Sequence, residues 1–250
     1  MTGKFFYKSP FLLSYETEIL KILEEGIILK DTIAYPEGGG QVGDIGKIIK
    51  LNDNKEINFF DTKKLKGRKI KINDFPNIEV ENEILHYVDN VKNNNFFKVG
   101  DRVKIEVDKQ RRAMATLNHT GIHLVLMALN EIRKEDLSLR IYGAKISEKS
   151  ARLDFKLDEK FTQEELKKVY EKVMKLANEN KEIKLYSHSE EKEAIYWECN
   201  GYVMPCGGTH FLNTGIIKDF KLKRRTLGSE AERVIATFEP SKDFGKFYYD

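Results

Sequence analysis

The chain has 250 residues, 40% of them hydrophobic, which is enough to bury the core of one large domain or of two modest ones. Its 43 Lys and Arg residues against 40 Asp and Glu residues give a formal charge of +3, which permits an anionic partner without demanding one. No stretch approaches the roughly 18 consecutive apolar residues of a membrane-spanning helix, so we expect no membrane association.

The N-terminal segment lacks the features of an export signal. Its apolar run is short and no small-residue cleavage site follows, so we expect no signal peptide. The two cysteines, Cys199 and Cys206, therefore favour a metal or catalytic role over a disulfide. Aromatic neighbours make Cys199 the better candidate for packing. The sequence predicts a cytoplasmic protein.

Short strands separated by turns are predicted for the first hundred residues. Residues 26–36, 46–51 and 56–62 are rich in β-branched and aromatic side chains. Residues 99–107 alternate apolar and polar side chains, which predicts a half-buried strand. Several short strands at this spacing are typical of a small barrel or a sandwich.

Glycines are concentrated in residues 35–46, YPEGGGQVGDIG. Three of them match the G-x-G-x-x-G spacing of dinucleotide-binding proteins, but a strand-like segment follows where that motif requires a helix, so we exclude it. Gly39, Gly40 and Gln41 repeat the GGQ tripeptide of peptide-chain release factors, which cleave an ester on tRNA. Two interpretations stay open: a turn in which the glycines adopt positive φ, or a segment whose backbone approaches a ligand closely.

A long helix is predicted to begin after Asp108, which is a suitable N-cap residue. Apolar residues recur at helical spacing between 114 and 132, so we expect most of this helix to be buried. His119 and His123 are four residues apart and therefore lie one turn apart on one face, roughly opposite the main apolar stripe. This pair alone is compatible with a metal site or with two unrelated polar residues.

Further strands and one more helix are predicted for the remainder of the chain. Residues 138–146 and 151–157 are strand-like, and a helix begins at Thr162, which can form a capping box with Glu165. Later strand-like segments are residues 182–187, 202–206, 216–223 and 233–238. Long helices with a mostly antiparallel sheet predict an α+β fold.

Residues 204–210, MPCGGTH, supply a second pair of metal-binding side chains. Cys206 and His210 are four residues apart, and the glycines between them predict a loop. Together with the two helical histidines they form a set that suits tetrahedral zinc. The alternative is that these residues are ordinary members of a crowded interior, but a chain with only five histidines and two cysteines favours the metal. Because Thr120 stands where a metalloprotease requires a glutamate, we exclude a protease.

These segments together resemble the free-standing alanyl-tRNA editing proteins, which are related to the editing domains of alanyl- and threonyl-tRNA synthetases. The HTxxH motif of that family appears at residues 119–123, its CxGTH motif at residues 206–210, and its glycine-rich segment at residues 36–44. The motifs occur in the family's order, residues 107–120 match its lead-in, and the resemblance covers essentially the whole chain.

The resemblance implies a small N-terminal β-barrel domain over residues 1–107 and an α+β editing domain over residues 108–250, with long helices on a mostly antiparallel sheet. It also implies hydrolysis of the aminoacyl ester of mischarged tRNA for alanine, chiefly seryl-tRNA. One zinc ion per chain is expected, with the ligands His119, His123, Cys206 and His210. Since four protein ligands leave no position for water, either Cys206 gives way during catalysis or zinc holds the substrate's amino group.

Several residues are expected to contact the substrate. The expected set is Gly38, Gly39, Gly40 and Gln41 of the glycine-rich loop, Thr120, and the basic residues Lys221, Lys223, Arg224 and Arg225. The basic residues would bind tRNA phosphates, helped by Arg111 and Arg112 at the start of the long helix. Alanine is smaller than serine and cannot be excluded by size, so the hydroxyl of Thr120 is expected to bind the serine hydroxyl and to act in catalysis. Its alternative role is a bond to the helix carbonyl four residues earlier.

Two departures from the family are present. Relatives often have a glutamine near the strand after the long helix, and residues 134–144 contain none. Gly121 replaces a residue that is commonly alanine. The missing glutamine leaves a second hypothesis open, a zinc-stapled tRNA-binding module that hydrolyses nothing.

Overall fold

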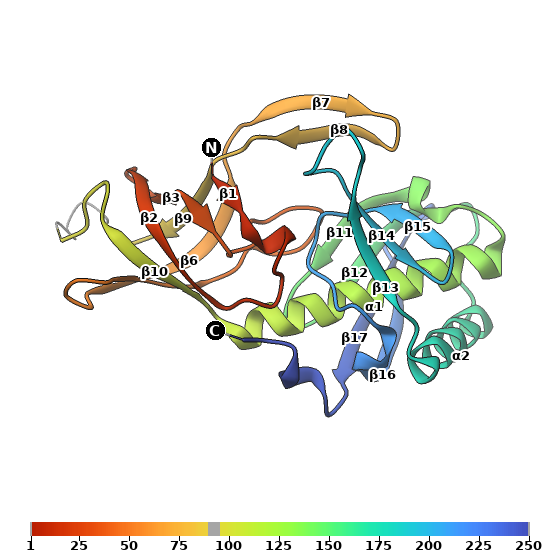
Figure 1. Cartoon of the computed structure of the whole chain (residues 1–250). Helices are drawn as coiled ribbons and strands as arrows, with labels where there is room; N and C mark the ends of the chain where they lie inside the picture. The colour runs from red at the N-terminus through yellow and green to blue at the C-terminus, as the bar shows by residue number, and fades with distance from the viewer. Residues whose placement is uncertain (1, 90–95, 250) are drawn as a thin grey trace.

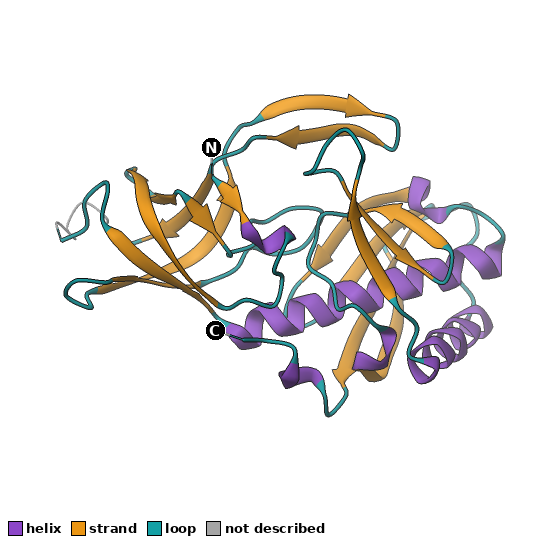
Figure 2. Ribbon diagram, viewed as in Figure 1, coloured by secondary structure: helices purple, strands orange, loops and turns teal. Residues whose placement is uncertain are grey.

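The computed structural model describes residues 2–89 and 96–249 (Figure 1). The first part of the chain forms a closed barrel, and the rest forms antiparallel sheets with two helices (Figure 2). This arrangement confirms the predicted α+β class, and it decides for a barrel over a sandwich in the first part. Across the two described ranges, no helix is long and apolar enough to span a membrane.

Six strands close the barrel in the order β10-β2-β3-β9-β6-β5. Their bounds are β2 (Ser14–Ile22), β3 (Gly26–Leu29), β5 (Gly46–Lys50), β6 (Glu56–Lys64), β9 (Ile84–Val88) and β10 (Arg102–Val107). In β10, Val103, Ile105 and Val107 are buried and the residues between them are not, so the predicted alternation is confirmed. The inward-facing apolar side chains fill the barrel, as small barrels require.

A hairpin inserted between β6 and β9 reaches from the barrel over the second part of the chain (Figure 1). Its strands are β7 (Arg68–Ile72) and β8 (Phe75–Val80). At its tip, Tyr196 Oη donates a hydrogen bond to Asp74 Oδ2 (2.8 Å), and the rings of Phe75 and Tyr196 lie 5.0 Å apart. The hairpin therefore bridges the two parts of the chain. Near its base, the short strands β1 (Gly3–Lys4) and β4 (Asp31–Thr32) pair in parallel.

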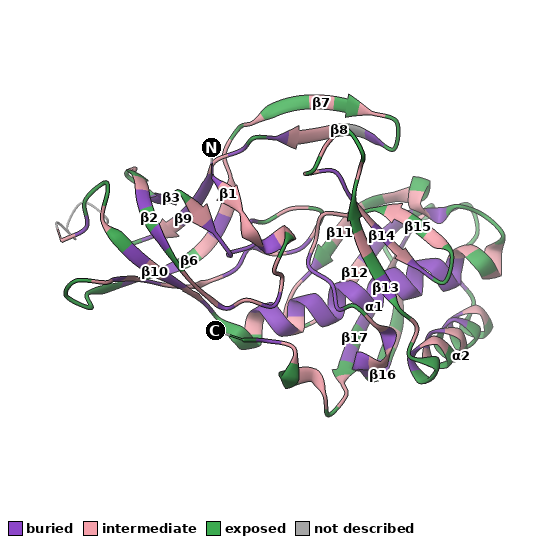
Figure 3. Cartoon of the chain, in the orientation of Figure 1, coloured by how far each residue is buried: buried purple, intermediate pink, exposed green. Residues whose placement is uncertain are grey.

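The long helix α1 (Lys109–Arg133) runs from the barrel through the middle of the second part (Figure 2). The predicted N-cap is confirmed, because the Asp108 side chain accepts a hydrogen bond from the Arg111 amide (2.7 Å). The helix ends at Lys134, which adopts a left-handed conformation with φ of 54°. Its middle is buried almost all round, as the sequence predicts (Figure 3).

Two antiparallel sheets complete the second part. The four-stranded sheet has the order β11-β12-β17-β16, and the three-stranded sheet has the order β13-β14-β15. Their bounds are β11 (Ile141–Ile146), β12 (Ala151–Lys156), β13 (Ile183–Ser187), β14 (Ile195–Cys199), β15 (Tyr202–Pro205), β16 (Ile217–Thr226) and β17 (Ala231–Pro240). Helix α2 (Gln163–Glu179) begins at the predicted capping box of Thr162 and Glu165 and packs against α1 and β16.

One continuous set of buried apolar side chains joins the barrel to the second part. It runs from Ile105 in β10 through Leu124 in α1 to Phe155 and Phe238 in the four-stranded sheet. The predicted boundary between residues 107 and 108 falls between β10 and α1. The division into two domains stays a prediction, because the core is shared across it.

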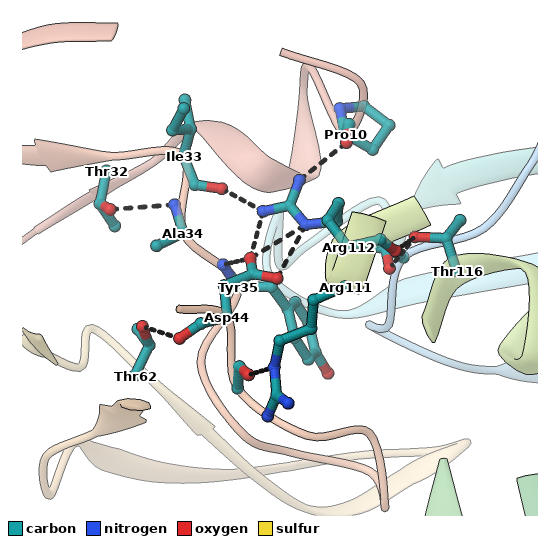
Figure 4. Close-up of polar contacts among 12 residues, drawn as sticks. Pro10, Thr32, Ile33, Ala34, Tyr35, Asp44, Thr62, Arg111, Arg112 and Thr116 are labelled. Carbon is teal, nitrogen blue, oxygen red and sulfur yellow. Dashed lines mark hydrogen bonds and ion pairs between the residues drawn. The ribbon is translucent and has the colours of Figure 1, made fainter. Parts of the chain in front are cut away.

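A buried ion pair fastens the glycine-rich segment to α1 (Figure 4). The Arg112 guanidinium is fully buried and bonds both carboxylate oxygens of Asp44, whose side chain is 3% exposed. It also donates to the carbonyl oxygens of Pro10 (2.8 Å) and Ile33 (2.6 Å). Arg112 is therefore unable to bind phosphates as the sequence suggested. Its positive charge is neutralised inside the protein by Asp44. A buried guanidinium can be tolerated when it is paired and hydrogen-bonded.

Candidate metal centre

Four side chains meet where α1 passes the loop that follows β15. His119 and His123 come from successive turns of α1, and Cys206 and His210 come from the loop. One potential ligand atom from each residue lies within 4.8 Å of all the others. The Cys206 sulfur is 3.5 Å from His119 Nε2 and 3.2 Å from His210 Nε2. The structure thus brings together the four residues that the sequence proposed as ligands.

The loop reaches the helix because Gly208 has no side chain. A Cβ at this position would lie 2.1 Å from Cε1 of His119, a separation that no real contact allows. The same Cβ would lie 2.9 Å from Oε1 of Gln41. The Gly208 amide instead lies 3.5 Å from the Cys206 sulfur and donates toward it. The glycine in the CxGTH motif therefore permits the close packing that brings its Cys and His to the helix.

Burial sets the protonation of these groups. It lowers the pKa of His119 to about 3 and lowers those of His123 and His210 well below the usual value of 6.5. It raises the pKa of the Cys206 thiol to about 12, although the Gly208 amide acts in the opposite direction. The three imidazoles are consequently neutral at pH 7, and a neutral ring carries the lone pair that a metal ligand needs.

Two of the rings contain a buried nitrogen without a partner. The Nδ1 atoms of His123 and His210 have no hydrogen-bond partner in the described part of the chain. Unpartnered buried polar atoms are costly, so the bonds within the protein leave these two rings incompletely satisfied. Three neutral imidazoles and a thiol form a nitrogen and sulfur donor set that suits zinc, and a bound cation would favour the thiolate. The residues present fit a zinc ion.

A cavity of about 560 Å³ opens onto this cluster. His119, His123 and Cys206 line one side of it, and the β7–β8 hairpin lines another through Phe75. Cys206 is the least buried of the four candidate ligands. Tyr7 also lines the cavity, and its hydroxyl would lie 3.4 Å from a Cβ at Gly207. Neither Tyr7 nor the hairpin was identified from the sequence, because no local motif marks them.

The glycine-rich loop reaches the same cavity from the barrel side. Gly38 and Gly39 line it, and the tight turn is closed by reciprocal backbone bonds between Gly38 and Gln41. Gly39 and Gly40 have φ values of 59° and 84°, which favour glycine. The turn pairs with β11, because the Ile146 amide donates to the Gly40 carbonyl (2.7 Å). The structure confirms the turn, and the backbone of Gly38 and Gly39 lines a cavity; the close approach of this segment to a ligand stays a prediction.

Thr120 is placed differently from the other predicted residues. Its hydroxyl donates to the Thr116 carbonyl (2.9 Å) and accepts a hydrogen bond from the Phe211 amide (3.0 Å). The side chain is fully buried and is absent from the cavity lining. These bonds hold Phe211, the residue after His210, against α1. The bond to the Thr116 carbonyl is the alternative role that the sequence suggests for Thr120. Binding of a substrate hydroxyl by Thr120 stays a prediction.

The predicted basic cluster in β16 is divided between the two faces of its sheet. Lys221, Lys223 and Arg225 alternate along the strand and are exposed. Arg224 lies on the opposite face, where it donates to the buried Glu232 carboxylate (2.6 Å). Arg224 therefore does not share the exposed face with its neighbours. The sequence alone does not show which of these residues lies on the exposed face, because that depends on how the strand is oriented in the sheet.

Comparison with known proteins gives three findings. Residues 183–234, which contain Cys206 and His210, match the family described as the threonyl and alanyl tRNA synthetase second additional domain. The alanyl-tRNA editing protein AlaX-M of Pyrococcus horikoshii is 30% identical over 242 residues, which cover 94% of this chain and 96% of that protein. The alanine–tRNA ligases of Pyrococcus furiosus and Thermococcus kodakarensis are 26% and 28% identical over 94% of this chain. The chain spans about a quarter of the length of those ligases, because the match covers 25% of each.

Proposed function

The chain belongs to the family of the alanyl-tRNA editing proteins, and from this membership we propose that it hydrolyses the aminoacyl ester of mischarged tRNA for alanine, chiefly seryl-tRNA, in a zinc-dependent reaction in the cytoplasm. The observation that carries this proposal is the buried cluster of three histidines and one cysteine beside a cavity. Residues of the β7–β8 hairpin and of the second part of the chain line this cavity, and we propose that it accepts the aminoacyl end of the tRNA.

We assign the zinc ligands to His119, His123, Cys206 and His210. When bound, zinc would act as a Lewis acid or would bind the substrate's amino group. The protein's own contribution is to keep the three imidazoles neutral and to leave Cys206 at the cavity wall. Cys206 is the least buried of the three proposed ligands that line the cavity, so it is the one that substrate or water can displace most easily, which supports a catalytic role for Cys206 beyond structural binding.

The glycine-rich loop is suited to hold the aminoacyl end of the tRNA. Gly38 and Gly39 present backbone without side chains to the cavity, so a ribose can approach closely. A Cβ at Gly39 would meet no atom within 4 Å, which leaves room for a ligand beside it. The walls include Ile122 and Leu126, which limit the access of water to the ester.

The exposed face of the four-stranded sheet is a candidate surface for tRNA phosphates. Directly paired residues share a face, so the register places Lys223, Arg152 and Lys145 in one row across the strands. Arg225 pairs with Arg233 in the next row. The basic face thus comprises Lys145, Lys221, Lys223 and Arg225, together with Arg152 and Arg233, which share an ion pair with the carboxylate of Asp154. Phosphate contacts at such a face would position the tRNA without reading its sequence.

A second hypothesis is a zinc-stapled tRNA-binding module without hydrolytic activity. Four protein ligands are typical of structural zinc, and this observation favours it. Incubation of the protein with seryl-tRNA separates the two hypotheses, because only the hydrolase releases free serine. Release is expected for the wild type and should greatly exceed release of alanine from alanyl-tRNA. A protein that binds zinc and tRNA but releases no serine would establish the module.

The two cysteines provide a matched pair of variants for this assay. Cys206→Ala should lose zinc and hydrolysis together, because it removes a proposed ligand. Cys199→Ala removes the other thiol, which is 1% exposed and packed in β14, and should retain both. If Cys206→Ala hydrolyses seryl-tRNA as well as Cys199→Ala does, the metal centre is not the site of the reaction.

A further inference from the structure

The side chain of Gln41 connects the glycine-rich loop to the metal centre. It is fully buried, and all its polar atoms are bonded to residues of the second part of the chain. Its Oε1 lies 2.7 Å from His119 Nδ1 and accepts a hydrogen bond from the Thr209 amide (3.0 Å). Its Nε2 donates to Thr209 Oγ1 (2.8 Å). One amide thus touches a candidate ligand on α1 and the residue that precedes His210.

These bonds determine which nitrogen of His119 carries its proton. A backbone amide can only donate, so the Gln41 atom that meets Thr209 N must be the carbonyl oxygen. The same oxygen faces His119 Nδ1, and an oxygen acceptor requires a protonated nitrogen. Nδ1 of His119 is therefore the N–H donor, and Nε2 carries the lone pair. That Nε2 faces the sulfur of Cys206 at 3.5 Å, where a metal would be shared between them.

His119 differs in this respect from the other two rings. The Nδ1 atoms of His123 and His210 have no hydrogen-bond partner among the described residues. Metal-binding histidines usually donate their second ring nitrogen to an acceptor that fixes the ring. Here the acceptor for His119 comes from the barrel, 78 residues away in the chain.

The loop that supplies Gln41 is held firmly enough to orient another side chain. Three residues on, the Asp44 carboxylate is bonded to the buried Arg112 of α1. The Val42 amide donates to the Ile146 carbonyl (3.0 Å), and Gly40 packs on Ala144 so closely that a Cβ would lie 2.8 Å from its methyl group. These contacts fix the backbone on both sides of Gln41. Its amide therefore approaches His119 from a rigid support.

We propose that Gln41 is a positioning residue, which fixes the tautomer and the orientation of His119 as a metal ligand. This inference deepens the proposed function and rests on its metal site. It assigns the glutamine of the glycine-rich segment to the metal centre instead of to the substrate. Because the same side chain also bonds Thr209, it connects the half of the metal site on α1 to the half in the loop after β15.

The test measures metal binding directly and needs no substrate. Zinc affinity is determined by competition with a chromophoric chelator, and Co²⁺-loaded protein is examined by its visible absorption spectrum. Gln41→Leu removes the acceptor and should weaken zinc binding by about 10- to 100-fold and alter the Co²⁺ spectrum. Gln41→Glu keeps an oxygen acceptor for His119 and should bind zinc at least as well as the wild type. Gln41→Asn, whose oxygen is withdrawn by one methylene, provides a second loss-of-acceptor variant should Gln41→Leu fail to fold.

Thr116→Val is the matched control. Its hydroxyl belongs to the same buried network, at 2.7 Å from Thr209 Oγ1, but it does not touch His119. It should leave zinc affinity within about threefold of the wild type. If Thr116→Val weakens zinc binding as much as Gln41→Leu, the network acts only through loop stability and the inference is overturned. Zinc affinity and a Co²⁺ spectrum unchanged in Gln41→Leu would overturn it as well. A wild-type protein that binds no zinc would overturn the metal site itself, and with it the role of Gln41.

Discussion

Replacing Gly39 by valine should remove most of the hydrolysis of seryl-tRNA, whereas the same change at Gly100 should leave it intact. The two glycines are similar in that both have positive φ, 59° and 89°, and a Cβ at either position meets no atom within 4 Å. A side chain at a positive φ costs about 1–2 kcal/mol, so both variants should be destabilised, Gly100→Val at least as much as Gly39→Val. They differ in place, since Gly39 lines the cavity and Gly100 lies in a turn before β10.

The expected loss of activity follows from the position of the new side chain. Valine at residue 39 would occupy space in the cavity that the candidate metal ligands also line, where we propose that the aminoacyl ester lies. Displacing a reacting group by about 1 Å costs on the order of 10²-fold in rate, and we expect at least this loss in kcat/KM. Release of labelled serine under single-turnover conditions measures the rate, and thermal unfolding checks that Gly39→Val is no less stable than Gly100→Val. Equal rates for the Gly39→Val and Gly100→Val proteins would refute the placement of substrate against this loop.

Three further predictions concern other parts of the molecule. Thr120→Val should lower cleavage of seryl-tRNA with zinc still bound and should erode the preference over alanyl-tRNA; if alanyl-tRNA is spared as before, the hydroxyl serves only its bonds inside the protein. Neutralising Lys221 and Lys223 with glutamine should weaken tRNA binding equally for different sequences and reduce the salt dependence by up to about two phosphate contacts. Two exposed lysines of α2 changed in the same way form the control, and an unchanged salt slope in the β16 variant would exclude that face. Burial lowers the pKa of His86 to about 4. An unfolded histidine titrates near 6.5, so the unfolded chain gains the proton first as the pH falls, and the zinc-loaded protein should lose about 2 kcal/mol of stability between pH 7 and pH 5. His86→Gln should lack this part of the pH dependence, and an identical pH profile would contradict the assignment.

Local features of the sequence predicted the fold well. The helix after Asp108 and the helix after Thr162 begin at the expected caps, because capping depends on residues only three positions apart. The alternation in residues 99–107 identified a barrel strand for the same reason. The pairing of the two metal-binding motifs came from their chemistry and from the family resemblance, since 83 residues separate His123 from Cys206.

Long-range contacts account for what the sequence did not predict. Arg112 was grouped with phosphate-binding residues, because nothing near it in the chain shows that Asp44 will neutralise it. Arg224 was grouped with exposed lysines, because its face of the sheet depends on the register of β16 against β17. The contact of Gln41 with His119 joins positions 78 residues apart, and the tripeptide around Gln41 suggested a ligand instead of a neighbouring ring.

Asp44 and Arg112 lie on opposite sides of the predicted domain boundary. Separating the two parts of the chain would therefore leave each of these buried charges without its partner. Loss of one partner of a buried ion pair costs on the order of 3–5 kcal/mol, which is comparable to the whole stability of a small domain. We therefore expect the barrel and the helical part to melt in a single cooperative transition, and residues 108–250 produced alone to fold poorly. In such a cooperative unit, a metal ion that binds only the native state stabilises every element by the same amount. Hydrogen exchange in the barrel strands should consequently slow when metal is added, although none of these strands supplies a proposed ligand.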